Sequence, residues 1–85
     1  MRHARDQDLD RIDPLLDRLR AIAALTEKKR GVFYVKAKSF LHFHEDPAGM
    51  FADIRTADWS DFERLQVDTP AAWDDLVAKA AARAG

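Results

Sequence analysis

The sequence contains no cysteine, and it has only three glycines and three prolines among its 85 residues. The absence of cysteine excludes disulfide bonds, cysteine-ligated zinc sites, iron–sulfur clusters and thiol catalysis. The scarcity of glycine argues against a glycine-rich phosphate-binding loop. No apolar run approaches the roughly 18 residues of a membrane helix, and residues 1–12 are too polar for a signal peptide. We therefore expect a single small cytoplasmic domain.

Neither sign of charge dominates the chain. Its 14 basic and 15 acidic side chains give a net charge of −1, which argues against a dedicated nucleic-acid binder. The charge is uneven, because residues 1–38 carry +4 and residues 39–85 carry −5. This asymmetry can attract the two halves to each other or orient association with another molecule. A simpler explanation is that both charged faces are solvated.

The first element that the sequence predicts is a helix over residues 14–30. Asp13 and Pro14 are typical of a helix start, because Asp13 can accept from free amides and Pro14 loses no hydrogen bond. Gly31 is typical of a helix end. Between them the apolar stripe recurs at three- and four-residue spacing: Leu15, Leu16, Leu19, Ile22, Ala23 and Thr26. We expect residues 1–12 to be a disordered tail or an extension of this helix, and residues 13–85 to form the domain.

A β-meander is predicted over residues 32–55. Residues 32–36 and 40–45 are rich in aromatic and β-branched side chains, and residues 50–55 follow the turn sequence Asp-Pro-Ala-Gly. Matching the apolar faces of the second and third strands places His42 opposite Asp53. A glycine bulge at the turn would instead shift the pairing by one residue and place Asp53 beside Phe43.

The remaining residues predict a short fourth strand over 62–67 and a second helix over 70–83. Thr69 and Pro70 repeat the cap-and-proline start of a helix. A lone antiparallel sheet needs a cover on its apolar face. We therefore predict a two-layer α+β domain, in which an N-terminal and a C-terminal helix lie on one face of a three- to four-stranded antiparallel meander.

The open face of this sheet is the expected place for a functional site. His42 and His44 point to one side of their strand, and the predicted register adds Asp53 and Arg55 to the same surface. His-x-His is a metal-ligand spacing, and Asp53 would be the third ligand or would orient His42. A structural pair is the alternative, in which the Asp53 carboxylate raises the pKa of His42. We favour the structural alternative and expect no cofactor.

Other chemistry has less support in the sequence. No serine or threonine near the histidines lies in a nucleophile elbow, so covalent catalysis is not indicated. Tyr34 lies within a basic cluster and could stack on a ligand or a nucleotide. The cluster consists of Lys28, Lys29, Arg30, Lys36 and Lys38. The alternative is that the first three residues complement the dipole at a helix end and that the two later lysines are simply solvated.

Three aromatic residues are difficult to bury in so short a chain: Phe40, Phe51 and Trp59. Aromatic side chains without a core to enter indicate an interface. A two-layer unit with a bare sheet face would be completed by a second copy in a two-fold dimer.

The hairpin Phe-Leu-His-Phe-His-Glu-Asp-Pro-Ala-Gly, with the following Phe-Ala-Asp-Ile-Arg and a Thr-Pro helix start, resembles a pattern in small uncharacterised bacterial proteins. The resemblance covers about residues 31–77. It implies a standalone cytoplasmic α+β protein and implies no activity. It draws attention to four residues that lie inside the pattern: His42, His44, Asp53 and Arg55.

Three functional hypotheses follow. The leading hypothesis is a non-enzymatic domain that acts through protein–protein contact as a homodimer. The second is a metal- or small-ligand-binding protein, which could be a hydrolase, that uses His42, His44, Asp53, Arg55 and Tyr34. The third and weakest is nucleic-acid binding through residues 28–38. No membrane partner is expected.

Overall fold

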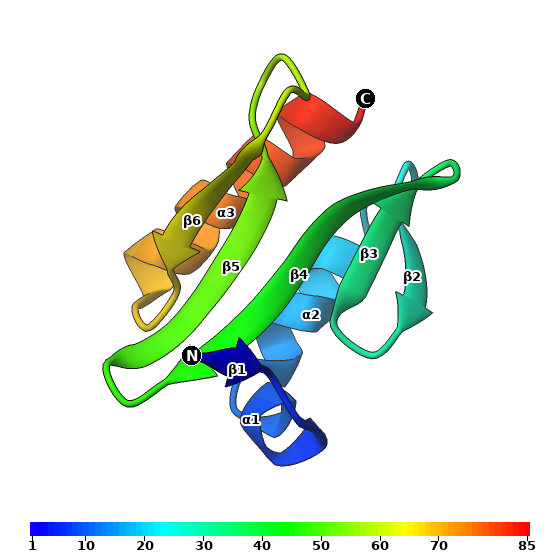
Figure 1. The fold of residues 1–85 in the computed structure, drawn as a ribbon. Coiled ribbons are helices and arrows are strands. Elements are labelled where there is room, and N and C mark those ends of the chain that lie inside the picture. Colours follow the sequence, from blue (N-terminus) through cyan, green and yellow to red (C-terminus); the bar gives the residue numbers. More distant parts are fainter.

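The computed structural model describes all 85 residues as one antiparallel sheet with three helices (Figure 1). The elements are β1 (Arg2–His3), α1 (Asp6–Asp10), α2 (Asp13–Arg20), β2 (Thr26–Lys29), β3 (Val32–Val35), β4 (Lys38–Asp46), β5 (Gly49–Arg55), β6 (Phe62–Gln66) and α3 (Pro70–Ala84). Strands β2 to β6 pair in sequence order, and β1 pairs with β4. The predicted α+β class is confirmed, with a larger sheet than expected.

The β4–β5 hairpin has the predicted register. Glu45 pairs with Met50, Phe43 with Ala52, and His42 with Asp53, so the turn contains no bulge. Asp46 pairs with Gly49, and its carboxylate accepts from the Ala48 amide at 2.9 Å. The predicted fourth strand is β6, which pairs with β5.

The prediction of a helix over residues 14–30 is within one residue at its start and wrong at its C-terminal end. The helix α2 begins at Asp13, is preceded by Ile12 as its cap residue, and ends at Arg20. Residues 26–29 form β2 instead, because they pair with β3 through a hairpin at Arg30 and Gly31. Gly31 has a φ of +78°, so its conformational freedom serves this hairpin rather than a helix end.

Residues 1–12 form two short elements, β1 and α1, rather than a tail or a continuous extension of α2. Asp8 accepts from the Arg5 amide at 2.9 Å and forms ion pairs with Arg2 and Arg11. Leu9 and Ile12 are buried in the core. This segment is therefore fixed to the sheet by backbone pairing, ion pairs and apolar contact.

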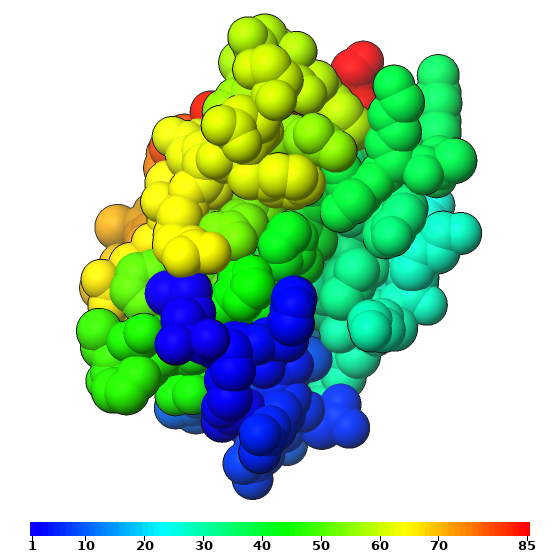
Figure 2. Space-filling model, in the orientation of Figure 1, coloured from blue at the N-terminus to red at the C-terminus, as the bar shows by residue number.

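Helices α2 and α3 lie on the same face of the sheet, as predicted (Figure 1). Their apolar residues form the core together with the inward side chains of the central strands, among them Leu16, Leu19, Leu41, Ile54 and Leu76. In the space-filling view the N-terminal residues, in dark blue, cover part of the face that the helices leave free (Figure 2). That face therefore has its own partial cover.

Helix α3 agrees with its predicted start. The Thr69 hydroxyl accepts from the Ala72 amide at 3.1 Å, and Pro70 follows as the first helical residue. Trp73 donates its indole N–H to the Val67 carbonyl at 2.8 Å, which fixes the helix to the end of β6. None of the three helices has the length and apolar character that crossing a bilayer requires.

Candidate metal centre

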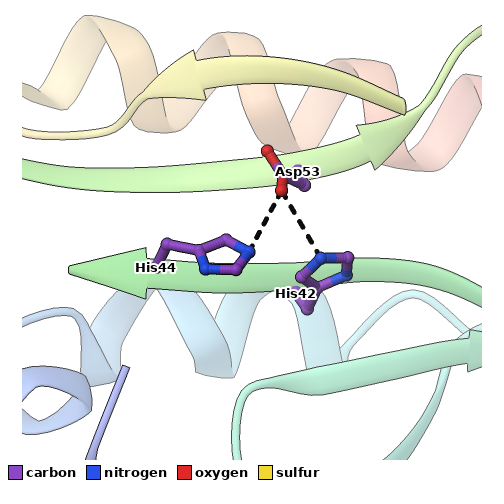
Figure 3. Close-up of side chains that lie close together, drawn as sticks. All are labelled: His42, His44 and Asp53. Carbon is purple, nitrogen blue, oxygen red and sulfur yellow. Dashed lines mark ion pairs between the residues drawn. The ribbon is translucent and has the colours of Figure 1, made fainter. Parts of the chain in front are cut away.

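The central strands bring two histidines and one aspartate together on the face opposite the helices. His42 and His44 are two residues apart on β4, so their side chains project to the same side. Asp53 lies on β5 directly opposite His42. Figure 3 shows both imidazoles turned toward the Asp53 carboxylate. The strand alternation and the hairpin register thus assemble the group that the sequence predicted.

One carboxylate oxygen is shared by both imidazoles. The Asp53 Oδ2 atom lies 3.1 Å from His44 Nε2 and 3.5 Å from His42 Nε2. Arg64 on β6 donates from Nε to Oδ1 and from Nη2 to Oδ2, each at 2.8 Å. Asp53 itself is only 8% exposed. Arg64 therefore fixes the carboxylate plane while Oδ2 still faces the histidines.

A third histidine joins this group from the N-terminus. His3 on β1 pairs with His44 in the sheet register, so the two side chains share a face. The ring centroids of His3 and His44 are 4.7 Å apart, and those of His3 and His42 are 6.2 Å apart. The chain has three histidines in all, and the fold gathers every one of them at this place.

Burial controls the protonation of the two β4 histidines. It lowers the pKa of His42 and of His44, because the charged imidazolium is poorly solvated there. The attraction of Asp53 acts in the opposite direction but is smaller. Asp53 therefore favours the protonated form of His42 as expected, but burial outweighs this attraction and the pKa of His42 is lowered overall. The hydrogen bond from Arg64 lowers the pKa of Asp53, so that the carboxylate is ionised beside two neutral imidazoles.

The spacing of these atoms suits a small divalent cation. One ligand atom from each of His42, His44 and Asp53 lies within 4.8 Å of the others. In a tetrahedral zinc site with bonds near 2 Å, neighbouring ligand atoms are about 3.3 Å apart. The two separations around Oδ2 bracket that value. With three protein ligands such a site keeps one position for water, a further ligand or a substrate.

Arg55, which the sequence placed with these residues, belongs to a different cluster. Its guanidinium lies over Phe62, 4.3 Å from the ring centroid, and against Trp59. It also donates to the Ser39 and Trp59 carbonyls. These contacts fix the connection between β5 and β6 to the sheet, so Arg55 has a packing role.

The three aromatic residues predicted to form an interface are largely covered by the chain itself. Phe40 is fully buried and stacks on Trp59, with ring centroids 5.3 Å apart. Trp59 donates its indole N–H to the Arg83 carbonyl at 3.0 Å. Phe51 is half-buried, and Met1 is the one large hydrophobic side chain that is exposed.

A hollow of about 730 Å³ adjoins the histidines. It lies between two segments that pair with β4: β1 at Glu45 and His44, and β3 at Leu41 to Lys38. His3, His42 and Tyr34 are among its lining residues, so Tyr34 faces the hollow next to the candidate metal centre. Neither this hollow nor the place of His3 in the site could be predicted from the sequence, because a two-residue strand has no readable period.

Comparison with protein-family models, with curated proteins and with solved structures finds no match for this chain.

Proposed function

We propose that the protein binds a divalent transition-metal ion, with zinc as the reference ion, through His42, His44 and Asp53. The observation that carries the proposal is the shared Asp53 Oδ2 atom, 3.1 and 3.5 Å from the two imidazole nitrogens. His3 lies beside His44, with the ring centroids 4.7 Å apart, where it would cover a bound ion. Nitrogen and oxygen donors without sulfur suit zinc, copper and nickel.

The protonation state supports binding. A metal ion requires neutral imidazoles and an ionised carboxylate, and proton release otherwise weakens binding. Burial lowers the pKa of both β4 histidines, and Arg64 lowers that of Asp53, so the ligands are already in the required form. Arg64 also has the position of an outer-shell group that orients a ligating carboxylate.

The structural alternative, which the sequence favoured, explains His42 and Asp53 as a cross-strand pair. A pair of this kind does not explain why the other two imidazoles of the chain lie at the same place. His42 and His44 both contact the Asp53 carboxylate, and His3 lies against His44. This clustering of all three histidines of the chain is the reason to prefer a metal-binding role.

Zinc titration of the chelator-treated protein tests the proposal. Calorimetry should give saturable binding with one ion per chain. Zinc should raise the melting temperature, because a ligand that binds only the native state stabilises it. His42→Ala and His44→Ala should each abolish both effects, and His3→Ala should weaken binding.

Asp75→Asn is the matched control, since Asp75 is an exposed acid on α3 that pairs with Lys79. It should bind zinc like the wild type. Absence of saturable binding in the wild type, or full binding by both β4 histidine variants, would contradict the metal role and leave the structural pair.

Self-association through the open sheet face remains a proposal with less support. It relied on Phe40, Phe51 and Trp59 as an exposed interface, whereas Phe40 is fully buried and the other two are half-buried. Sedimentation of the wild type at micromolar concentration tests it, and a monomer at all concentrations would remove it. Nucleic-acid binding through residues 28–38 has no further observation in its favour.

A further inference from the structure

We propose that the hollow beside the histidines binds a small organic anion. Such a ligand has a carboxylate or a phosphate attached to an aromatic or aliphatic group. This site goes beyond metal binding and does not require a bound ion. Its volume of about 730 Å³ lies within the range of small-molecule sites. The hollow combines unpaired charges, hydroxyl groups and fixed walls.

The unpaired charges at the hollow are positive. Arg5 and Lys29 line it, and neither has an ion-pair partner within the chain. The third basic residue, Arg30, is already bound to Asp6, Asp10 and Asp13. Asp6 is the only acidic residue of the lining, and it is the one that Arg30 holds. An anion entering the hollow therefore meets two cations that are free to bind it.

The uncharged part of the lining fits the organic portion of such a ligand. Leu9, Val32 and Phe43 supply apolar surface. Tyr34 and Ser39 also line the hollow, and neither side-chain hydroxyl has a hydrogen-bond partner within the chain. Apolar walls with a few convergent polar groups are the usual composition of a small-molecule site.

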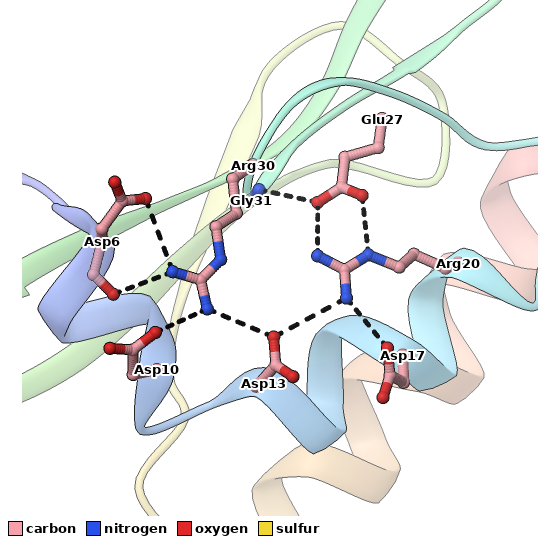
Figure 4. Close-up of polar contacts among 8 residues, drawn as sticks. All are labelled: Asp6, Asp10, Asp13, Asp17, Arg20, Glu27, Arg30 and Gly31. Carbon is pink, nitrogen blue, oxygen red and sulfur yellow. Dashed lines mark hydrogen bonds and ion pairs between the residues drawn. The ribbon is translucent and has the colours of Figure 1, made fainter.

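The walls are held in place by a network around two arginines (Figure 4). Arg20 on α2 binds Glu27 on β2 through two hydrogen bonds of 2.6 and 2.9 Å, and Glu27 accepts from the Gly31 amide. Arg30 joins the β2–β3 hairpin to α1 and to the start of α2. The hairpin that carries Lys29 and Tyr34 is thus fixed relative to α1. A preformed site loses less free energy on ordering when its ligand binds.

Binding of phenyl phosphate and of benzoate to the chelator-treated protein tests the inference, with benzyl alcohol as the neutral probe. Ligand-observed NMR and calorimetry should detect at least one of the two anions and should give no saturable binding of the alcohol. Binding of phenyl phosphate alone assigns the hollow to phosphates, and binding of benzoate alone assigns it to carboxylates. Affinity should fall as salt concentration rises, because the cations are exposed.

Lys29→Gln and Arg5→Gln should each weaken anion binding by about tenfold, the usual loss of one charge-assisted hydrogen bond. Lys38→Gln removes an exposed lysine outside the hollow and should have no effect. Circular dichroism of the variants verifies that they are folded. The inference is overturned if neither anion binds, if Lys29→Gln and Arg5→Gln bind like the wild type, or if anions bind only after zinc is added. The last result would place the anion on the metal, and zinc titration without anion tests that centre separately.

Discussion

At the scale of single residues, the Asp58 carboxylate accepts several hydrogen bonds from its neighbours. It lies in the connection between β5 and β6, beside Trp59, whose ring stacks on Phe40. The Ser60 hydroxyl donates to its Oδ1 atom at 2.7 Å, the Ser60 amide at 3.1 Å and the Thr56 hydroxyl at 2.8 Å. These hydrogen bonds lower the pKa of Asp58 from 3.8 to about 2.

The lowered pKa predicts an acid-dependent loss of stability. The carboxylate contributes stability above its unfolded pKa of 3.8, and this contribution disappears as the pH falls through about 2. Asp58→Asn should therefore show a smaller loss of unfolding free energy over this interval than the wild type. Urea unfolding at a series of pH values measures it, and Ser60→Ala should reproduce part of the change by removing the strongest donor. Parallel curves for wild type and Asp58→Asn would contradict this role.

At the scale of elements, local signals explain what the sequence could predict. The Asp46-Pro47 turn and the alternation of apolar residues on both sides determine the β4–β5 register, and hence the approach of His42 to Asp53. Thr69 and Pro70 determine the start of α3 in the same manner.

The errors come from interactions between segments. Thr26 fits the helical stripe, and the basic residues before Gly31 are typical of a helix end, but pairing with β3 and the contact between Arg20 and Glu27 make residues 26–29 a strand. Propensity is a weak prior that such tertiary contacts override. His3 entered the site through backbone pairing with His44, which no pattern in residues 1–12 could indicate.

The β2–β3 hairpin gives a prediction of its own. Gly31 is buried at a φ of +78°, and an added Cβ atom would lie 2.8 Å from Leu9 Cδ2. Gly31→Ala should lower the free energy of unfolding by about 1–2 kcal/mol, because alanine is strained in this conformation and Leu9 must move. Denaturant unfolding measures the change. Gly85→Ala is the control, since its added Cβ would lie 3.7 Å from the Ala81 carbonyl and is expected to change little. Equal stability of both variants would show that the hairpin tolerates a side chain.

At the scale of the whole molecule, a thin core and dispersed ion pairs hold the chain together. The charge asymmetry of the sequence is partly used within the chain, because Arg2 pairs with Glu45 and Arg18 pairs with Asp74. Both pairs are partly or well exposed, and such pairs contribute little to stability. The apolar contacts of α2 and α3 with the sheet must therefore supply most of the stability.

Leu19 lies at the centre of that contact and is fully buried. Leu19→Ala should cost about 2–5 kcal/mol, through lost burial and the cavity left behind. A domain of this size has about 5–10 kcal/mol in total, so this variant should melt at a much lower temperature or be unfolded at room temperature. Arg18→Ala, on the exposed side of the same helix, should change stability by less than about 1 kcal/mol. Thermal melts followed by circular dichroism compare the two, and a wild-type melt for Leu19→Ala would place the core elsewhere.

The edge of β4 is closed by two separate strands, β3 along one part and the two residues of β1 along another. Should β1 detach, the amide and carbonyl groups of β4 near His44 would be open to strands from other molecules, which is the usual origin of β-aggregation. Arg2 and Glu45, which form an ion pair at this edge, place charges where an incoming strand would have to dock. The shortest strand of the fold therefore has two roles. It supplies a histidine to the site, and it covers a strand edge through which molecules would otherwise aggregate in concentrated solution.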